Sequence, residues 1–331
     1  MTTAANLELT LEAQGSLPNF RYDILQPLLQ GRAPIEGVTL KPTGPAAGAG
    51  FFENPRFREG AFDLLDTNWG DLLPGISEGW DMACLPVFIK RKPVYNYLWV
   101  RTDRGIEGPK DLEGKTIATG GYTSAITIYT RGFLQHFYGV DLTKLRWISG
   151  AKRWEVHDPR IEVDYPEARK SQVDRLLDGE ADAGTGDITD VKAWDALESN
   201  PQVKRLFPDY QALNQRLFKE HGIFTPVHII AIGGRTLRQH PGLARRLYDA
   251  FQRSCELAYQ DALGDGSSFS MTINNRELIQ TQLREWGDVY KHGISANRNT
   301  IDYFLDYCHE QGVTGTRLSL EQVFPKETLE T

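Results

Sequence analysis

A glycine-rich turn between two patterned segments is the first place where this sequence could bind a small charged molecule. An apolar run at residues 115–118 ends near Gly120, and apolar residues then recur at helical spacing from Ile126 onwards. Glycine lets the backbone come close to a ligand, and the first N–H groups of a helix have no partner within that helix. The pattern indicates either an anion seat or an ordinary helix cap. The residues of the candidate seat are Gly121, Tyr122, Thr123 and Ser124.

One histidine and two aspartates could carry acid–base chemistry. His228 lies in the apolar run HGIFTPVHIIAIGG, and because a histidine titrates near neutral pH it is the preferred proton donor. Asp66 and Asp187 follow the strand patterns FDLLD and ADAGTGD, at the ends of strands where open α/β sheets bind ligands. Either aspartate could orient the histidine or hold a ligand hydroxyl, or could simply cap the next helix. His228 could likewise only hydrogen-bond the backbone.

Aromatic and amide side chains near the same strand ends could contact an aromatic ligand. Trp69 and Tyr122 could stack on a ring, although aromatic residues near a sheet end also form core. Asn68, which precedes Trp69, is placed with these candidate binding residues. No His-x-x-x-His or paired-cysteine spacing occurs, so we expect no metal site. The three cysteines are far apart and odd in number, which favours buried, reduced thiols.

Strand and helix patterns alternate along the chain, which predicts an α/β fold with two lobes. Two apolar runs, at residues 85–102 and 221–234, are interrupted by proline and suit extended crossovers between the lobes. Two crossings divide the chain into a discontinuous first lobe, residues 1–95 with 230–331, and a second lobe, residues 96–229. Such lobes form a clamshell with a ligand cleft that closes about its hinges.

Length and charge narrow the possible partners. The 331 residues can bury a sizeable core, and 37 basic against 44 acidic residues give a formal net charge of −7. Since no long basic run occurs, we expect neither nucleic acid nor a membrane as a partner. The N-terminal segment lacks a basic stretch followed by an apolar one, and no long apolar run occurs elsewhere. We therefore expect a cytoplasmic protein, and a homo-oligomer is left open.

Six segments, in order and with sensible spacing, resemble one enzyme family. These segments are YDILQPLLQGRAPIEGVTL, FDLLDTNWGDLL, LPVFIKR, GIEGPKDLEGKTIATGGYTSAITIYTRGFLQHFYGVD, VKRLFPDY and GIFTPVHIIAI. Together they resemble 4,5-dihydroxyphthalate decarboxylase and its relatives, enzymes on the type II periplasmic binding protein fold. The resemblance implies that Arg91 corresponds to a family arginine that could clamp a substrate carboxylate, unless it belongs to an exposed basic stretch. Val94 and Tyr95 replace an expected Arg-His pair, so the acid could be phthalate-like or benzoate-like.

The implied activity is decarboxylation of a hydroxylated aromatic acid without a cofactor. This reaction needs a seat for the carboxylate, a proton donor at the carbon that loses CO2, and stabilisation of charge on the ring oxygens. A phenol ortho or para to the departing group lets the ring act as its own electron sink. Two alternatives stay open: a non-catalytic protein that captures a small aromatic carboxylate, since fold does not decide function, and a biosynthetic enzyme resembling pyrimidine-precursor synthases.

Overall fold

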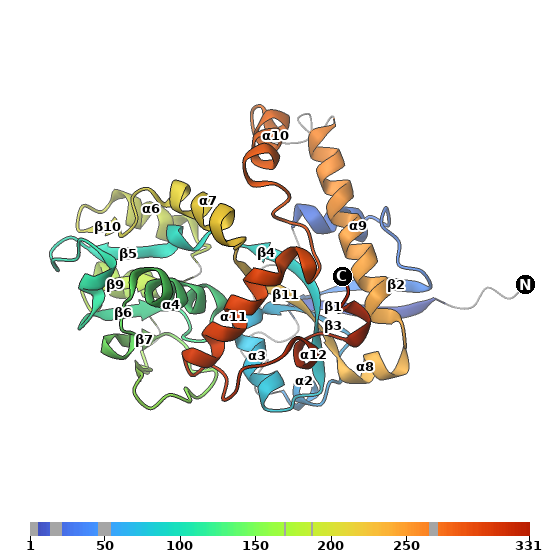
Figure 1. Cartoon of the computed structure of the whole chain (residues 1–331), viewed down its shortest axis with the longest axis horizontal. Helices are drawn as coiled ribbons and strands as arrows, with labels where there is room; N and C mark the ends of the chain where they lie inside the picture. Colours follow the sequence, from blue (N-terminus) through green and yellow to red (C-terminus); the bar gives the residue numbers. More distant parts are fainter. Residues whose placement is uncertain (1–5, 14–21, 46–53, 169, 187, 265–270) are drawn as a thin grey trace, which may run out of the picture.

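The computed structural model has two α/β lobes, each built on one mixed sheet (Figure 1). It describes residues 6–13, 22–45, 54–168, 170–186, 188–264 and 271–331. This two-lobed architecture is the one that the alternation of strand and helix patterns predicts, and the expected fold class is confirmed.

The first sheet has the strand order β2-β1-β3-β11-β4. Its strands are β1 (Leu7–Ala13), β2 (Val38–Pro45), β3 (Leu64–Asn68), β4 (Met82–Arg91) and β11 (Pro226–Gly233). β1 pairs in parallel with β2 and β3, whereas β11 runs antiparallel between β3 and β4. β3 and β11 are buried along most of their length, as expected for apolar central strands covered on both faces.

The second sheet has the strand order β10-β5-β9-β6-β7-β8. Its strands are β5 (Leu98–Arg101), β6 (Thr116–Thr119), β7 (Arg146–Ser149), β8 (Glu162–Asp164), β9 (Ala183–Thr185) and β10 (Val203–Arg205). β6 lies between β7 and β9 in parallel pairing, and β5 runs antiparallel to β9 and β10. The glycine-rich turn follows β6, at the carboxyl end of this sheet.

Helices cover both sheets, and two of them link parts of the chain that are distant in sequence. The α-helices are α1 (Gln26–Leu29), α2 (Pro55–Arg58), α3 (Trp69–Ser77), α4 (Ala125–Tyr138), α5 (Gln172–Leu177), α6 (Val191–Ser199), α7 (Tyr210–His221), α8 (Gly234–Gln239), α9 (Leu243–Leu263), α10 (Asn275–Trp286), α11 (Arg298–Glu310) and α12 (Leu320–Val323). α9 packs on β4 of the first sheet, while α11 packs on α4 of the second lobe (Figure 1). The C-terminal part of the chain therefore contacts both lobes.

The chain passes between the lobes twice. β4 leads through the 3₁₀ helix Val94–Tyr97 into β5, and residues 222–225 lead from α7 back into β11. β11 lies in the first sheet from its first residue, Pro226. The lobe limits at residues 95 and 229, given by the sequence, stay a prediction.

A shared aromatic core packs the lobes together. The ring of Trp69, from α3, stacks on Phe304, from α11, with 4.4 Å between ring centroids. Tyr129, from α4 of the second lobe, lies 4.6 Å from the same Phe304 ring, and Phe88 lies 5.5 Å from Trp69. Such ring pairs contribute about 0.5–1.5 kcal/mol each beyond the apolar area that they bury. The two lobes are thus in contact in this structure.

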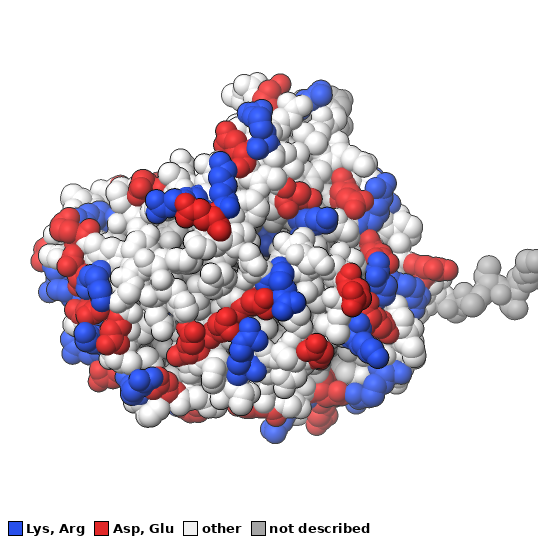
Figure 2. Space-filling view, in the orientation of Figure 1, with Lys and Arg blue, Asp and Glu red and all other residues white. Residues whose placement is uncertain are grey.

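Charged side chains of both signs are mixed over the face of the molecule seen in Figure 2. Basic and acidic residues lie beside one another there, and no broad patch of one sign gathers on that face. Binding of an acid would therefore depend on individual charged side chains near the site rather than on the field of that face.

Candidate active site

His228 and Asp66 form a hydrogen-bonded pair at the centre of the first sheet. β11 and β3 are antiparallel neighbours, with His228 opposite Asn68 and Ile230 opposite Asp66, so the histidine and the aspartate are diagonal neighbours on one face. The distance between His228 Nδ1 and Asp66 Oδ1 is 2.6 Å. Their side chains are 12% and 6% exposed, so the pair is mostly shielded from water.

The pair has the arrangement needed for proton transfer. Because a carboxylate only accepts hydrogen bonds, His228 donates through Nδ1 to Asp66, and its Nε2 is left for other chemistry. A carboxylate at this distance fixes the orientation of the ring and stabilises an imidazolium. The hydroxyl of Tyr22 lies 3.5 Å from Asp66 Oδ2, at the outer limit of hydrogen bonding. Asp187, the other predicted catalytic residue, lies outside the described residues.

Asn68 connects the two lobes beside this pair. Its Oδ1 accepts a hydrogen bond from the N–H of Gly70, at 3.1 Å, and so caps α3. The same oxygen accepts from the N–H of Ala125, at 2.9 Å, and so also satisfies the first turn of α4. Its Nδ2 lies 3.4 Å from Ser124 Oγ. Asn68 thus holds the start of α4 against the start of α3, a role that its place before a helix does not reveal.

The backbone donors expected to form an anion seat already have partners. The N–H of Tyr122 donates to Ser149 Oγ at 3.1 Å, and the N–H of Ser124 donates to the carbonyl of Gly121 at 3.1 Å. The N–H of Ala125 is held by Asn68. The expectation of unpaired donors at these three positions is therefore wrong in this structure, because the second lobe itself supplies the acceptors for Tyr122 and Ser124, and Asn68 of the first lobe supplies the acceptor for Ala125.

The carboxylate that lies at the start of α4 belongs to the protein. Asp71, from the first turn of α3, is fully buried and accepts a hydrogen bond from Thr123 Oγ1 at 2.5 Å. The guanidinium of Arg153 pairs with the other oxygen of Asp71, and burial lowers the pKa of Arg153. The indole N–H of Trp154 donates to the Asp71 carbonyl at 2.8 Å. Thr123 thus binds the carboxylate of Asp71, and this hydrogen bond joins the two lobes.

Arg91 binds protein groups rather than facing His228. At the end of β4 this side chain is only 8% exposed. Nη1 donates to the carbonyl of Phe224 at 2.9 Å, and Nη2 donates to Asn297 Oδ1 at 2.7 Å and to the carbonyl of Lys291 at 3.3 Å. Burial lowers the pKa of Arg91 to about 10. These contacts tie β4 to the second crossover and to the C-terminal region, and do not fit the expected substrate clamp.

The two aromatic residues expected to stack on a ligand are core residues. Trp69 is fully buried and its ring is covered by Phe304. Tyr122 is also buried; its hydroxyl donates to the carbonyl of Gln311 at 3.3 Å, and the guanidinium of Arg131 lies 3.7 Å from its ring centroid. Neither ring can reach a ligand without a rearrangement of the contact between the lobes.

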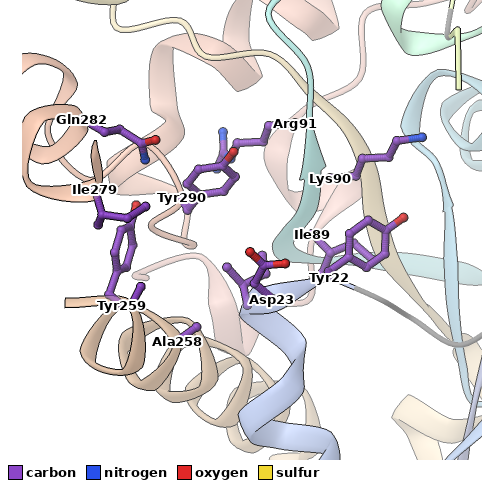
Figure 3. A pocket seen from close by; sticks show the side chains of 12 residues that line it. Tyr22, Asp23, Ile89, Lys90, Arg91, Ala258, Tyr259, Ile279, Gln282 and Tyr290 are labelled. Atoms are coloured by element: carbon purple, nitrogen blue, oxygen red, sulfur yellow. The ribbon is translucent and has the colours of Figure 1, made fainter. Parts of the chain in front are cut away.

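A pocket of about 390 Å³ lies between η1 (Asp23–Leu25), the end of β4, α9 and α10, and its lining includes Tyr22, which contacts Asp66, but neither His228 nor Asp66. Tyr22 and Lys90 form part of its wall (Figure 3). In Figure 3, Tyr259 and Tyr290 lie on its opposite side, and the Asp23 carboxylate lies between the two sides. The pocket is large enough for a substituted benzene ring.

Other kinds of site find little support in the described part of the chain. No group of three His, Cys, Asp or Glu side chains there could hold a metal ion. Cys84, Cys255 and Cys308 are buried, and burial raises the pKa of each thiol, which makes them poor nucleophiles. Of the helices that the structure describes, none is both long and apolar enough to cross a membrane.

The fold places the chain beside known structures. The chain has the fold of type II periplasmic binding proteins. Solved structures with this fold include a periplasmic sulfonate-binding protein, SsuA, from Methylobacillus flagellatus, with a TM-score of 0.62 and 11% identity over 99% of this chain and 94% of that chain. The alkanesulfonate-binding protein SsuA from Xanthomonas axonopodis pv. citri, bound to MOPS, has a TM-score of 0.54 and 13% identity over 97% of this chain and 99% of that chain.

Sequence comparison confirms the resemblance to the 4,5-dihydroxyphthalate decarboxylases. A protein of that name from Comamonas testosteroni is 28% identical over 324 residues, 93% of this chain and 95% of the relative. A second, from Pseudomonas putida, is 27% identical over 130 residues, 39% of this chain and 50% of the relative. No family model matches the chain.

Sequence reasoning missed three polar residues at the site. Tyr22 reaches Asp66 from a segment that precedes a short helix, and Asp71 reaches Thr123 from the opposite lobe. Lys90 lies directly opposite His228 in the pairing of β4 with β11. All three depend on tertiary contacts. Only the LPVFIKR segment gave a signal, by placing two cations at the end of a strand.

Proposed function

We propose that the protein is a cofactor-independent decarboxylase of a hydroxylated aromatic carboxylic acid and acts in the cytoplasm. The observation that carries this proposal is the 2.6 Å contact between His228 Nδ1 and Asp66 Oδ1 on neighbouring strands, which turns a histidine into an oriented proton donor. The named relatives at 27–28% identity support a reaction on a phthalate-like acid.

In the proposed reaction the imidazolium of His228 gives its Nε2 proton to the ring carbon that carries the departing carboxylate. A hydroxyl para to that carbon supplies the electron pair and becomes carbonyl-like. The bond from the ring to the carboxylate then breaks, its electrons restore the aromatic ring, and CO2 leaves. The net change is replacement of CO2 by one proton, which His228 regains from water. Asp66 stabilises the imidazolium and keeps Nδ1 protonated throughout.

The alternative function is capture of a small carboxylate without chemistry. The observation in its favour is the fold that this chain shares with a sulfonate-binding protein and with an alkanesulfonate-binding protein bound to MOPS. Both functions need an acid in the cleft, so binding alone does not distinguish them. The presence of a buried His–Asp pair favours the enzyme, because a receptor needs no oriented proton donor.

The deciding experiment is incubation of the native protein with a panel of hydroxyphthalates and hydroxybenzoates, with CO2 release and calorimetric affinity measured on the same samples. The decarboxylase is supported by release of CO2 from at least one acid at more than the rate without protein. Tight binding of several acids without CO2 from any of them would instead establish the binding protein. Panel members that lack a phenol ortho or para to the carboxylate serve as controls and should stay intact.

A further inference from the structure

We propose that Lys90 binds the carboxylate that stays on the ring during decarboxylation, and so selects phthalate-type acids, with two neighbouring carboxylates, over benzoate-type acids. This inference rests on the proposed function. It starts from Arg91, whose two terminal nitrogens donate to the carbonyl of Phe224 and to Asn297 Oδ1. Arg91 uses three of its five N–H donors on protein groups, so a neighbouring cation is the better candidate for the substrate carboxylate.

Strand register brings Lys90 onto the face that carries the His–Asp pair. Lys90 lies opposite His228 in the pairing of β4 with β11, and Asn68 lies opposite His228 on the other side, in β3. Directly opposed residues of antiparallel strands share a face of the sheet. His228 directs its ring to Asp66, so this is the face on which the proton donor works.

The direction of the side chains agrees with this register. In Figure 3 the Lys90 side chain and the hydroxyl of Tyr22 extend the same way, away from Tyr259, whereas Arg91 lies beside Tyr290. The Tyr22 hydroxyl lies near the Asp66 carboxylate. Lys90 therefore extends toward the side of the sheet where the pair is found.

A bulge in β4 produces this placement. Leu85 lies opposite Ile230 and Lys90 opposite His228, so β4 advances five residues (90 − 85) while β11 advances two (230 − 228). Two contacts from the C-terminal region hold the extra residues. The N–H of Phe88 donates to His292 Nδ1 at 3.3 Å, and the N–H of Gly293 donates to the carbonyl of Pro86 at 2.9 Å. Bulges commonly redirect side chains next to active sites.

Buried His292 keeps the bulge in place. Burial lowers the pKa of His292 to about 3, so its Nδ1 remains an acceptor for the Phe88 N–H at physiological pH. The C-terminal region thus fixes which residue of the LPVFIKR segment lies opposite the proton donor.

Charge explains what Lys90 would do there. The Asp66 carboxylate repels any acid that enters beside it, and a lysine ammonium on the same face offsets this repulsion with three rotatable donors. Holding the departing carboxylate would stabilise the ground state and slow its loss, whereas holding the neighbouring carboxylate positions the ring without that penalty. Lys90 is thus assigned to the carboxylate that remains in the product.

The test compares Lys90→Met and Lys90→Arg with the native protein and with Lys41→Met, a control that removes an exposed lysine of β2 paired with Glu8. Affinity is measured by calorimetry for two probes: 3,4-dihydroxybenzoate, which keeps the carboxylate, and catechol, which lacks it. We expect Lys90→Met to weaken 3,4-dihydroxybenzoate binding about 10- to 100-fold, the range for a hydrogen bond to a charged group, and to leave catechol binding within about twofold. Lys90→Arg should restore most of the loss.

Equal affinity of the native protein and Lys90→Met for 3,4-dihydroxybenzoate would overturn the assignment while leaving the decarboxylase intact. Equal losses for both probes would overturn it too, because the lysine would then only shape the site. If the native protein bound neither probe and released no CO2 from 4,5-dihydroxyphthalate, the proposed function and this inference would fail together. Melting temperatures of all variants separate loss of binding from loss of folding.

Discussion

Replacing Asp66 by asparagine removes the negative charge beside His228 while keeping the size of the side chain. The 2.6 Å contact is a charge-assisted hydrogen bond between mostly buried groups, of a kind that contributes about 1.5–3 kcal/mol. If the hydrogen bond stabilises mainly the transition state of proton transfer, loss of this energy corresponds to roughly a 10- to 150-fold loss of rate. We therefore expect kcat for CO2 release to fall by about 10- to 100-fold, with little change in affinity for the product.

The assay is continuous CO2 release at saturating 4,5-dihydroxyphthalate, with product affinity measured by calorimetry. Asp261→Asn is the matched control, because it removes a carboxylate from an exposed ion pair with Arg32. A variant of Asp66 that kept its kcat but lost affinity would refute the reasoning, since Asp66 would then hold the substrate instead of orienting His228.

Two further predictions concern stability. Asp71→Asn should lower the free energy of unfolding by about 2–4 kcal/mol in a urea titration, because it leaves the partly buried Arg153 without its counter-charge. A change below about 0.5 kcal/mol would show that the contact between the lobes does not depend on the Asp71–Arg153 pair. Burial holds the pKa of His292 at about 3 against 6.5 in the unfolded chain, so the unfolded state binds the extra proton and stability falls as the pH drops through this window. Replacing His292 by asparagine should remove about 3 kcal/mol of the stability lost between pH 7 and pH 4, and an unchanged pH profile would contradict the assignment.

The strand-helix alternation predicted the lobes, and the sequence offered Asp66 and Asp187 as two possible partners of His228 without deciding between them. Both residues belong to short apolar runs that form neighbouring strands, and their types suit a proton donor and its partner. β3 and β11 are antiparallel, so Asp66 near the end of one strand meets His228 near the start of the other, and this needs the pairing of the two strands. The hydrogen bond between His228 and Asp66 depends on the register of β11 against β3, which cannot be read from the sequence.

The contacts between the lobes could not be predicted. Gly121 to Ser124 follow the pattern of an anion seat, but the first lobe supplies Asn68 as acceptor for the N–H of Ala125 and Asp71 as the bound carboxylate, while Ser149, of the same lobe as Tyr122, accepts from the N–H of Tyr122. Local sequence specifies donors at a helix start without specifying which distant group approaches them. For Thr123 and Ala125, the contact with the first lobe decides which group that is.

The placement of Lys90 opposite His228 has a local cause that periodicity cannot show. In a regular strand, alternate residues point to opposite faces of the sheet, so the face of one residue gives the faces of all the others. The bulge at residues 86–89 interrupts this alternation in β4. The anchors of the bulge, His292 and Gly293, lie some two hundred residues further along the chain, as their contacts show. Trp69 is a comparable case, because its ring is covered by Phe304 of α11, far along the chain.

The most direct test of the account is CO2 release from carboxyl-labelled 4,5-dihydroxyphthalate by the native protein and by His228→Gln, at saturating substrate. A proton donor contributes about 10²–10⁴-fold to the rate, so we predict labelled CO2 from the native protein and a loss of that size in the variant, with product affinity largely kept. Native-like release of labelled CO2 by His228→Gln would contradict the account.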